Sequence, residues 1–147
     1  MESQEAILLI EDDVDDRQLT QHALRRANIN NEVVFAYDGE AAMAHLVDDS
    51  KPLPTVILLD LHLPKLSGLE VLQRIRSTER TRLLPVVILT ASDDLSQVPE
   101  AYALGANSFI KKPTDPAEFS EMVLQVGMYW LLLNKGPSGL RRPGGNV

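Results

Sequence analysis

The sequence feature that most constrains the fold is the apolar run from Val56 to Leu59, which ends at Asp60. The run begins after Pro54 and Thr55, and Pro64 stops the segment. An uninterrupted apolar run of this length is typical of a strand that is covered on both faces inside a parallel sheet. Ligands of open α/β sheets bind at the carboxyl ends of the strands. Asp60 is therefore expected in a ligand-binding crevice.

The composition of the chain limits its class. Its 147 residues, 44% hydrophobic and 24% charged, fit one globular domain with a core of its own. The net charge of -7 argues against a nucleic-acid surface and favours protein partners. The absence of cysteine excludes disulfides and thiolate metal sites and suits a reducing cytoplasm. The polar stretch 1–5 does not resemble a signal peptide, and the apolar run 128–133 is too short to span a membrane.

Apolar strand-like runs alternate with amphipathic segments along the chain. The predicted strands are 6–10, 32–37, 56–60, 85–90 and 108–110, and the predicted helices are 15–27, 39–47, 69–76, 93–104 and 116–133. Strand and helix alternate five times, without an internal sequence repeat. This alternation predicts an α/β fold with a parallel sheet, right-handed crossovers and helices on both faces. We expect a flavodoxin-like (βα)5 domain over 1–133, doubly wound, with strand order 2-1-3-4-5. The segment 134–147, rich in Gly, Pro and Arg, is predicted to be disordered.

Several residues mark the expected helix ends. The candidate caps are Asp38 for the second helix, Ser92 or Asp93 for the fourth, and Thr114 or Asp115 for the fifth. Pro116 suits the first position of the fifth helix. Pro99 must lie in the first turn of the fourth helix or bend it, and Gly105 would end that helix.

The predicted order places reactive side chains at one edge of the sheet. They are Glu11 and Asp12, with Asp13 as a further candidate, after the first strand, Asp60 after the third, Thr90 after the fourth and Lys112 after the fifth. Converging carboxylates raise a pKa or require a cation, and oxygen ligands with room for water suit Mg²⁺. A lysine and a hydroxyl beside them would suit the oxygens of a transferred phosphoryl group. An aspartate can be the nucleophile that accepts it.

These motifs resemble the receiver domain of two-component response regulators, the CheY-like superfamily. The matching motifs over about 6–133 are Leu9–Asp13, Leu58–Pro64, Leu89–Ala91 and Lys112–Pro113. Asp13 leaves the acidic pair ambiguous by one residue, and Lys111 does the same for the lysine.

The resemblance implies a role for each matching residue. Asp60 would accept the phosphoryl group, with Glu11 and Asp12 as the acidic pair. Asp12, Asp60 and the backbone carbonyl of His62 would hold Mg²⁺. Lys112 would pair with the phosphoryl oxygens, while Thr90 would swing toward them and the rotamer of Phe109 would follow. The protein would not be an enzyme beyond its own phosphorylation and dephosphorylation.

A narrower resemblance is to the single-domain regulators of bacterial phytochrome histidine kinases. Its cues are the acidic segment 11–17, the loop 48–54, the segment 105–107 and the apolar helix end 128–131. It implies a bacteriophytochrome kinase as the phosphoryl donor. The apolar residues around the end of the last helix, with Tyr129, Trp130 and Leu133 as the dimer face, predict a homodimer. Its interface would use the fourth helix, fifth strand and fifth helix, or the C-terminal extension.

Other interpretations of the same residues remain. Glu11 or Asp12 alone could cap a helix, Lys112 alone could be a solvated charge, and surface positions are favoured for His22 and His45. His62 could border the phosphoryl group and tune its hydrolysis. A Mg²⁺-dependent aspartyl phosphatase is an alternative, although such enzymes commonly place a second acid where His62 stands. A flavin or dinucleotide carrier would need a Gly-rich phosphate turn, whereas the first loop here has none and is strongly acidic. An unphosphorylated interaction scaffold would not need the converging acids, hydroxyl and lysine.

Overall fold

The sheet of the computed structural model has five parallel strands in the order β2-β1-β3-β4-β5, as predicted. The structure describes residues 6–29, 31–91, 93 and 95–134, so the predicted disorder of the tail beyond Asn134 lies outside the described residues. The strands are β1 Ile7–Ile10, β2 Val33–Ala36, β3 Val56–Asp60, β4 Val86–Thr90 and β5 Ser108–Lys111. The place where the strand order reverses lies between β1 and β3, which carry Glu11, Asp12 and Asp60 at their carboxyl ends.

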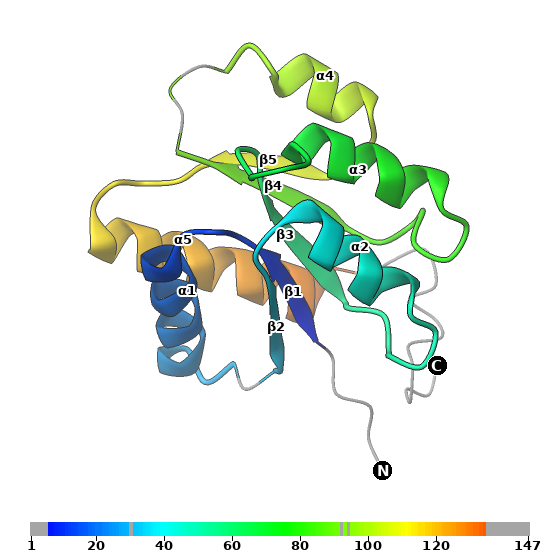
Figure 1. Cartoon of the computed structure of the whole chain (residues 1–147). Coiled ribbons are helices and arrows are strands. Elements are labelled where there is room, and N and C mark those ends of the chain that lie inside the picture. The colour runs from blue at the N-terminus through cyan, green and yellow to red at the C-terminus, as the bar shows by residue number, and fades with distance from the viewer. Residues whose placement is uncertain (1–5, 30, 92, 94, 135–147) are drawn as a thin grey trace.

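Helices cover both faces of the sheet, which confirms the doubly wound arrangement. They are α1 Val14–Arg26, α2 Gly39–Val47, α3 Gly68–Ser77, α4 Val98–Ala103 and α5 Pro116–Gly127, and α5 continues into the π-helical segment η1 Met128–Leu133. Figure 1 shows α1 and α5 on one side of the sheet and α2, α3 and α4 on the other. Both faces of the central strands are therefore covered, which explains their unbroken apolar sequences.

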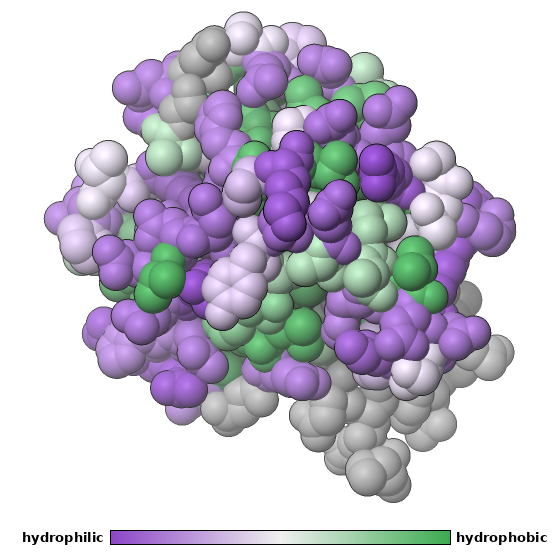
Figure 2. All heavy atoms as spheres, in the orientation of Figure 1, coloured by the Kyte–Doolittle hydropathy of each residue, from purple (hydrophilic) through white to green (hydrophobic). Residues whose placement is uncertain are grey.

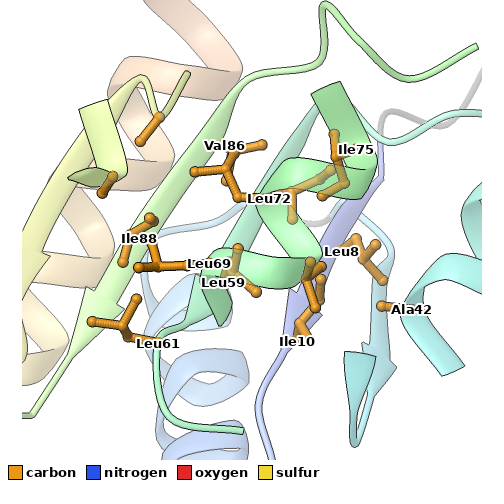
Figure 3. Packing of buried hydrophobic residues seen from close by; sticks show 14 of the residues in the cluster. Leu8, Ile10, Ala42, Leu59, Leu61, Leu69, Leu72, Ile75, Val86 and Ile88 are labelled. Atoms are coloured by element: carbon orange, nitrogen blue, oxygen red, sulfur yellow. The ribbon is translucent and has the colours of Figure 1, made fainter. Parts of the chain in front are cut away.

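Alternate residues of each central strand enter two separate apolar clusters. On β3, Ile57 and Leu59 face the cluster beneath α2 and α3, whereas Val56 and Leu58 face the cluster beneath α1 and α5. Figure 3 shows strand side chains meeting Leu69, Leu72 and Ile75 of α3. This packing on both sides fixes where β3 ends and so fixes the position of Asp60.

Side-chain caps fix the beginnings of several helices. Asp38 accepts a hydrogen bond from the Ala41 amide (2.8 Å), and Asp115, one of the two candidates, accepts one from Glu118 (3.0 Å). A capping box that was not predicted begins α3, and in it the side chains of Ser67 and Glu70 each accept a hydrogen bond from the other's backbone amide. This box holds the first turn of α3 immediately after the loop that follows Asp60.

The predicted start of the fourth helix was wrong. α4 begins at Val98 after Gln97, whose side chain makes no cap, so Asp93 does not cap it, and Leu95 lies outside the helix. Ser92, the other candidate, lies outside the described residues. The physical reason is Pro99: a helix that began near Asp93 would bury this proline in its interior, where it clashes and removes a hydrogen bond. Gly105 adopts φ 106° directly after the helix, as its predicted role requires.

The surface shown in Figure 2 is mostly hydrophilic, with hydrophobic side chains in limited areas between charged ones. Among the helices of the described residues, none combines the length and the apolar character that crossing a membrane requires.

Candidate phosphoacceptor site

The carboxyl ends of β1 and β3 bring three acidic side chains together. Glu11 and Asp12 follow β1, and the register that pairs Ile10 with Leu59 places them beside Asp60. Carboxylate oxygens of Glu11, Asp12 and Asp60 all lie within 4.8 Å of one another. Glu11 and Asp60 are buried, whereas Asp12 is exposed. The group is therefore a carboxylate cluster with one side open to solvent.

Lys112 lies against this cluster from the end of β5. Its side chain is buried, and its ammonium donates hydrogen bonds to Glu11 Oε1 (2.5 Å) and Asp16 Oδ2 (2.9 Å). Its distance to Asp60 Oδ1 is 3.8 Å, close enough for an ion pair but too long for a hydrogen bond. Asp16 was not among the predicted site residues, although its place in the first turn of a helix after an acidic strand end was a usable signal.

The structure resolves the two ambiguities of the sequence motifs. Asp13 is the N-cap of α1, where its Oδ1 accepts hydrogen bonds from the amides of Asp15 (2.8 Å) and Asp16 (3.1 Å). Lys111 forms an exposed ion pair with Asp93. Among the candidates, Glu11 and Asp12 therefore converge with Asp60, and Lys112 is the lysine that contacts this cluster. Their roles as acidic pair and site lysine stay predictions.

Thr90 lies on β4, the strand next to Asp60 in the sheet, and Phe109 lies on β5, one strand further out. Thr90 ends β4, is fully buried, and accepts the Lys112 amide hydrogen at its backbone carbonyl (2.7 Å). Its neighbour Leu89 pairs with Asp60 in the sheet. Phe109 of β5 is half-buried against the cluster beneath α2 and α3 and pairs with Ile88. These contacts place both residues where a change at Asp60 can reach α4 and β5, while the switching itself stays a prediction.

His62 supports the Asp60 carboxylate through its backbone amide. The His62 amide donates a hydrogen bond to Asp60, and the His62 side chain is exposed. The carbonyl of His62 as a metal ligand stays a prediction. None of the three histidines, all of which are described, belongs to the converging acidic group, consistent with an oxygen-only site.

Burial and charge shift the pKa values of the site. Burial raises the pKa of Glu11 to about 7 against the opposing effect of Lys112, and burial also raises the pKa of Asp60. Burial lowers the pKa of Lys112, but the hydrogen bonds that its ammonium donates to Glu11 and Asp16 outweigh this effect and raise the pKa to about 12. Lys112 therefore stays positively charged, and its charge only partly offsets the effect of burial on the carboxylates of Glu11 and Asp60. A divalent cation with a preference for oxygen ligands fits the remaining charge.

The sequence pattern of the response regulator receiver domain family matches residues 7–124. The chain belongs to this family. Response regulator Rcp1 of Synechocystis sp. is 37% identical over 129 residues, which cover 85% of this chain and 88% of Rcp1.

Solved structures of receiver domains superpose closely on this one. The phosphorylated cyanobacterial phytochrome response regulator RcpA matches with a TM-score of 0.86 at 34% identity, covering 92% of this chain and all of that one (100%). The Mn²⁺-bound form of Rcp1 matches with a TM-score of 0.84 at 36% identity, covering 90% and 99%. The bacteriophytochrome response regulator RtBRR is 42% identical, with a TM-score of 0.70 and coverage of 93% and 86%. Receiver domains related to this one therefore include a phosphorylated form and a metal-bound form.

Proposed function

We propose that this receiver domain accepts a phosphoryl group on Asp60 from a histidine kinase in a Mg²⁺-dependent reaction. The observation that carries the proposal is the arrangement at Asp60: carboxylate oxygens of Glu11 and Asp12 lie within 4.8 Å of an Asp60 oxygen, and the Lys112 ammonium lies 3.8 Å from Asp60 Oδ1. The phosphorylation switches protein binding or relays the phosphate onward. Phosphoryl transfer needs this kind of positioning and charge neutralisation more than it needs an acid or base.

Each side chain has a place in the transfer. An oxygen of Asp60 forms a bond to phosphorus while the bond from phosphorus to the donor's imidazole nitrogen breaks, and the leaving imidazole retains the bond's electron pair and takes up a proton. Lys112 neutralises charge that develops on the phosphoryl oxygens, and the Thr90 hydroxyl donates to one of them. Mg²⁺, when bound by Asp12 and Asp60 with the His62 carbonyl, supplies further positive charge to the same oxygens.

Acetyl phosphate, a small phosphoryl donor, tests the proposal directly. Incubation with acetyl phosphate and Mg²⁺ is expected to add the mass of one phosphoryl group to the intact protein. Asp60→Asn, which keeps the shape but not the nucleophilic charge, is expected to show no adduct, and EDTA should prevent it in the wild type. An adduct of undiminished yield on Asp60→Asn would reject Asp60 as the acceptor. Continuous turnover of many phosphate esters without an adduct would favour the aspartyl phosphatase instead.

The proposed kinase partner is a bacteriophytochrome. Its support is the similarity to RcpA and RtBRR, which are response regulators of phytochromes. A phosphorylated phytochrome kinase is expected to transfer its phosphoryl group to this chain at least about tenfold faster than an unrelated histidine kinase, a difference of about 1.4 kcal/mol in barrier. Equal transfer rates from both kinases would count against this partner.

We further propose that the chain forms a homodimer through the exposed apolar side of η1. Tyr129 and Leu133 are 48% and 66% exposed, whereas Trp130 is half-buried against the core and meets Tyr129 edge-on at 4.9 Å. Leu132, also on η1, is 67% exposed. Apolar side chains gathered on the surface of one helix end are typical of a contact surface.

Sedimentation tests the dimer. The wild type is expected to sediment as a dimer at tens of micromolar, and Leu132→Glu as a monomer, because the new charge would be buried in the interface. Leu83→Glu is the matched control, since Leu83 is also exposed (54%) but lies after α3. A wild-type monomer at that concentration, or equal effects of the two substitutions, would contradict the proposed face.

A further inference from the structure

Among the described residues, the ammonium of Lys112 has two hydrogen-bond partners, and one of them, Asp16, is not among the residues that the sequence motifs assigned to the site. The three N–H groups of a lysine can donate to three acceptors. Here Glu11 accepts at 2.5 Å and Asp16 at 2.9 Å, while Asp60 stays at 3.8 Å. The ammonium is thus held by Glu11 and Asp16, with capacity for one more acceptor near Asp60, where the oxygens of a phosphoryl group would lie.

Asp16 is itself fixed by a closed ring of hydrogen bonds. Glu11 Oε2 accepts from the Asp13 amide (3.2 Å), and Asp13 Oδ1 accepts from the Asp16 amide (3.1 Å). The Asp16 carboxylate accepts from Lys112, whose ammonium returns to Glu11. At the other end of this turn, the Asp16 carbonyl accepts from the buried Thr20 hydroxyl (2.8 Å). The ring links the first turn of α1 to the residue after β5 and leaves Asp16 little freedom.

We infer that Asp16 is a positioning residue for phosphoryl transfer, which holds the Lys112 ammonium in place beside Asp60. The inference rests on the proposed function of Asp60 and Lys112. Two anchors fix the direction of the ammonium in advance, so that less reorganisation is needed as charge develops on the phosphoryl oxygens. With one anchor the long lysine side chain samples more rotamers and is less often correctly placed.

The simpler explanation of Asp16 is an acid in the first turn of a helix, where it stabilises the helix dipole. Asp15 shares that position and is exposed. It is therefore the matched control, because its removal costs the same helix-dipole stabilisation and leaves the bond between Asp16 and Lys112 intact.

The test measures adduct formation at a series of acetyl phosphate concentrations with saturating Mg²⁺. Asp16→Ala is expected to lower the maximal rate about tenfold and to leave the half-saturating concentration and the Mg²⁺ affinity within about twofold, because Asp16 acts on the transition state through Lys112. Asp16→Asn, which keeps an oxygen acceptor without the charge, is expected between Asp16→Ala and the wild type. Asp15→Ala should match the wild type.

The outcomes separate this inference from the proposed function. A maximal rate of Asp16→Ala within twofold of the wild type, or equal losses in Asp15→Ala and Asp16→Ala, overturns the role of Asp16 alone. A tenfold loss of Mg²⁺ affinity in Asp16→Ala also overturns it, because the variant has then distorted the acidic cluster. An adduct that persists in Asp60→Asn overturns the proposed function, and the role of Asp16 with it.

Discussion

Replacement of Lys112 by methionine is expected to lower the free energy of unfolding by about 3 kcal/mol at pH 8 in EDTA, since removing one partner from buried ion pairs typically costs this much. Lys112 is 5% exposed and Glu11 is 2% exposed, so water cannot replace the lost cation. Methionine fills much the same volume, which keeps a cavity from adding to the loss. Urea unfolding measures the effect.

The loss should depend on pH, with a sign fixed by the raised pKa of Glu11. Burial raises this pKa to about 7, so Glu11 is mostly neutral at pH 5 and gains little from Lys112 there. A carboxyl whose folded pKa is raised destabilises the folded state increasingly as pH rises from its ordinary pKa of 4.5 to the folded pKa, and the loss is constant above that. In the variant, the pKa values of Glu11 and Asp60 also lose the lowering effect of Lys112. The loss of stability in Lys112→Met is therefore expected to be small at pH 5 and larger at pH 8.

Lys111→Met is the matched control for this prediction. Lys111 is the neighbouring residue, and its ion pair with Asp93 is exposed, so its loss should change stability by less than about 1 kcal/mol. Adduct formation from acetyl phosphate should fall about 100-fold or more in Lys112→Met, as loss of one preorganised charge does in other active sites, and stay near normal in Lys111→Met. If Lys112→Met lost the same unfolding free energy at pH 5 and pH 8, or if Lys111→Met lost as much as Lys112→Met, the proposed role of Lys112 in the acidic cluster would be contradicted.

Gly68→Ala is expected to destabilise the protein by about 3 kcal/mol, at the upper end of what overpacking usually costs. A Cβ at this position would lie 2.6 Å from the Asp60 carbonyl oxygen and 2.7 Å from Leu61 Cα. Both are backbone atoms, and the Gly68 amide also donates to the Leu61 carbonyl (2.9 Å). The start of α3 and the end of β3 must therefore separate, which should also weaken Mg²⁺ binding at Asp60.

Gly127→Ala provides the control, because it also adds one methyl group to a helix end. Its Cβ would meet Ile29 Cδ1 (2.9 Å) and Leu24 Cδ2 (3.1 Å), which are the ends of side chains that can move. The higher helix propensity of alanine, about 1 kcal/mol, offsets that adjustment. The midpoint of thermal unfolding, measured in EDTA, compares Gly68→Ala with Gly127→Ala. Similar midpoints for the two variants would show that the contact between α3 and β3 can relax.

The sequence predicted the positions of the elements better than their ends. The apolar runs predicted the three central strands, because strands covered on both faces cannot tolerate polar interruptions. The partly buried edge strands were predicted from weaker signals, β2 from its β-branched and aromatic residues and β5 from the short segment 108–110. The start of α4 was wrong because Asp93 offered a plausible cap, and only the incompatibility of Pro99 with a helix interior decided between the two starts. The capping box of Ser67 and Glu70 was present in the sequence, but its hydrogen bonds depend on a backbone geometry that the loop after Asp60 imposes.

By itself the sequence determined the topology and the reactive set of this protein. Five strands joined by helices must lie parallel, and parallel strands present Glu11, Asp12, Asp60, Thr90 and Lys112 at one edge. Only the tertiary structure decided which acids Lys112 contacts, since Glu11 is 101 residues away and Asp16 is 96. Hydrogen bonds are made or lost within a few tenths of an ångström. Strand order fixes positions only to the spacing between neighbouring strands, about 4.8 Å, so the packing of α1 against α5 and the sheet had to set the final distances.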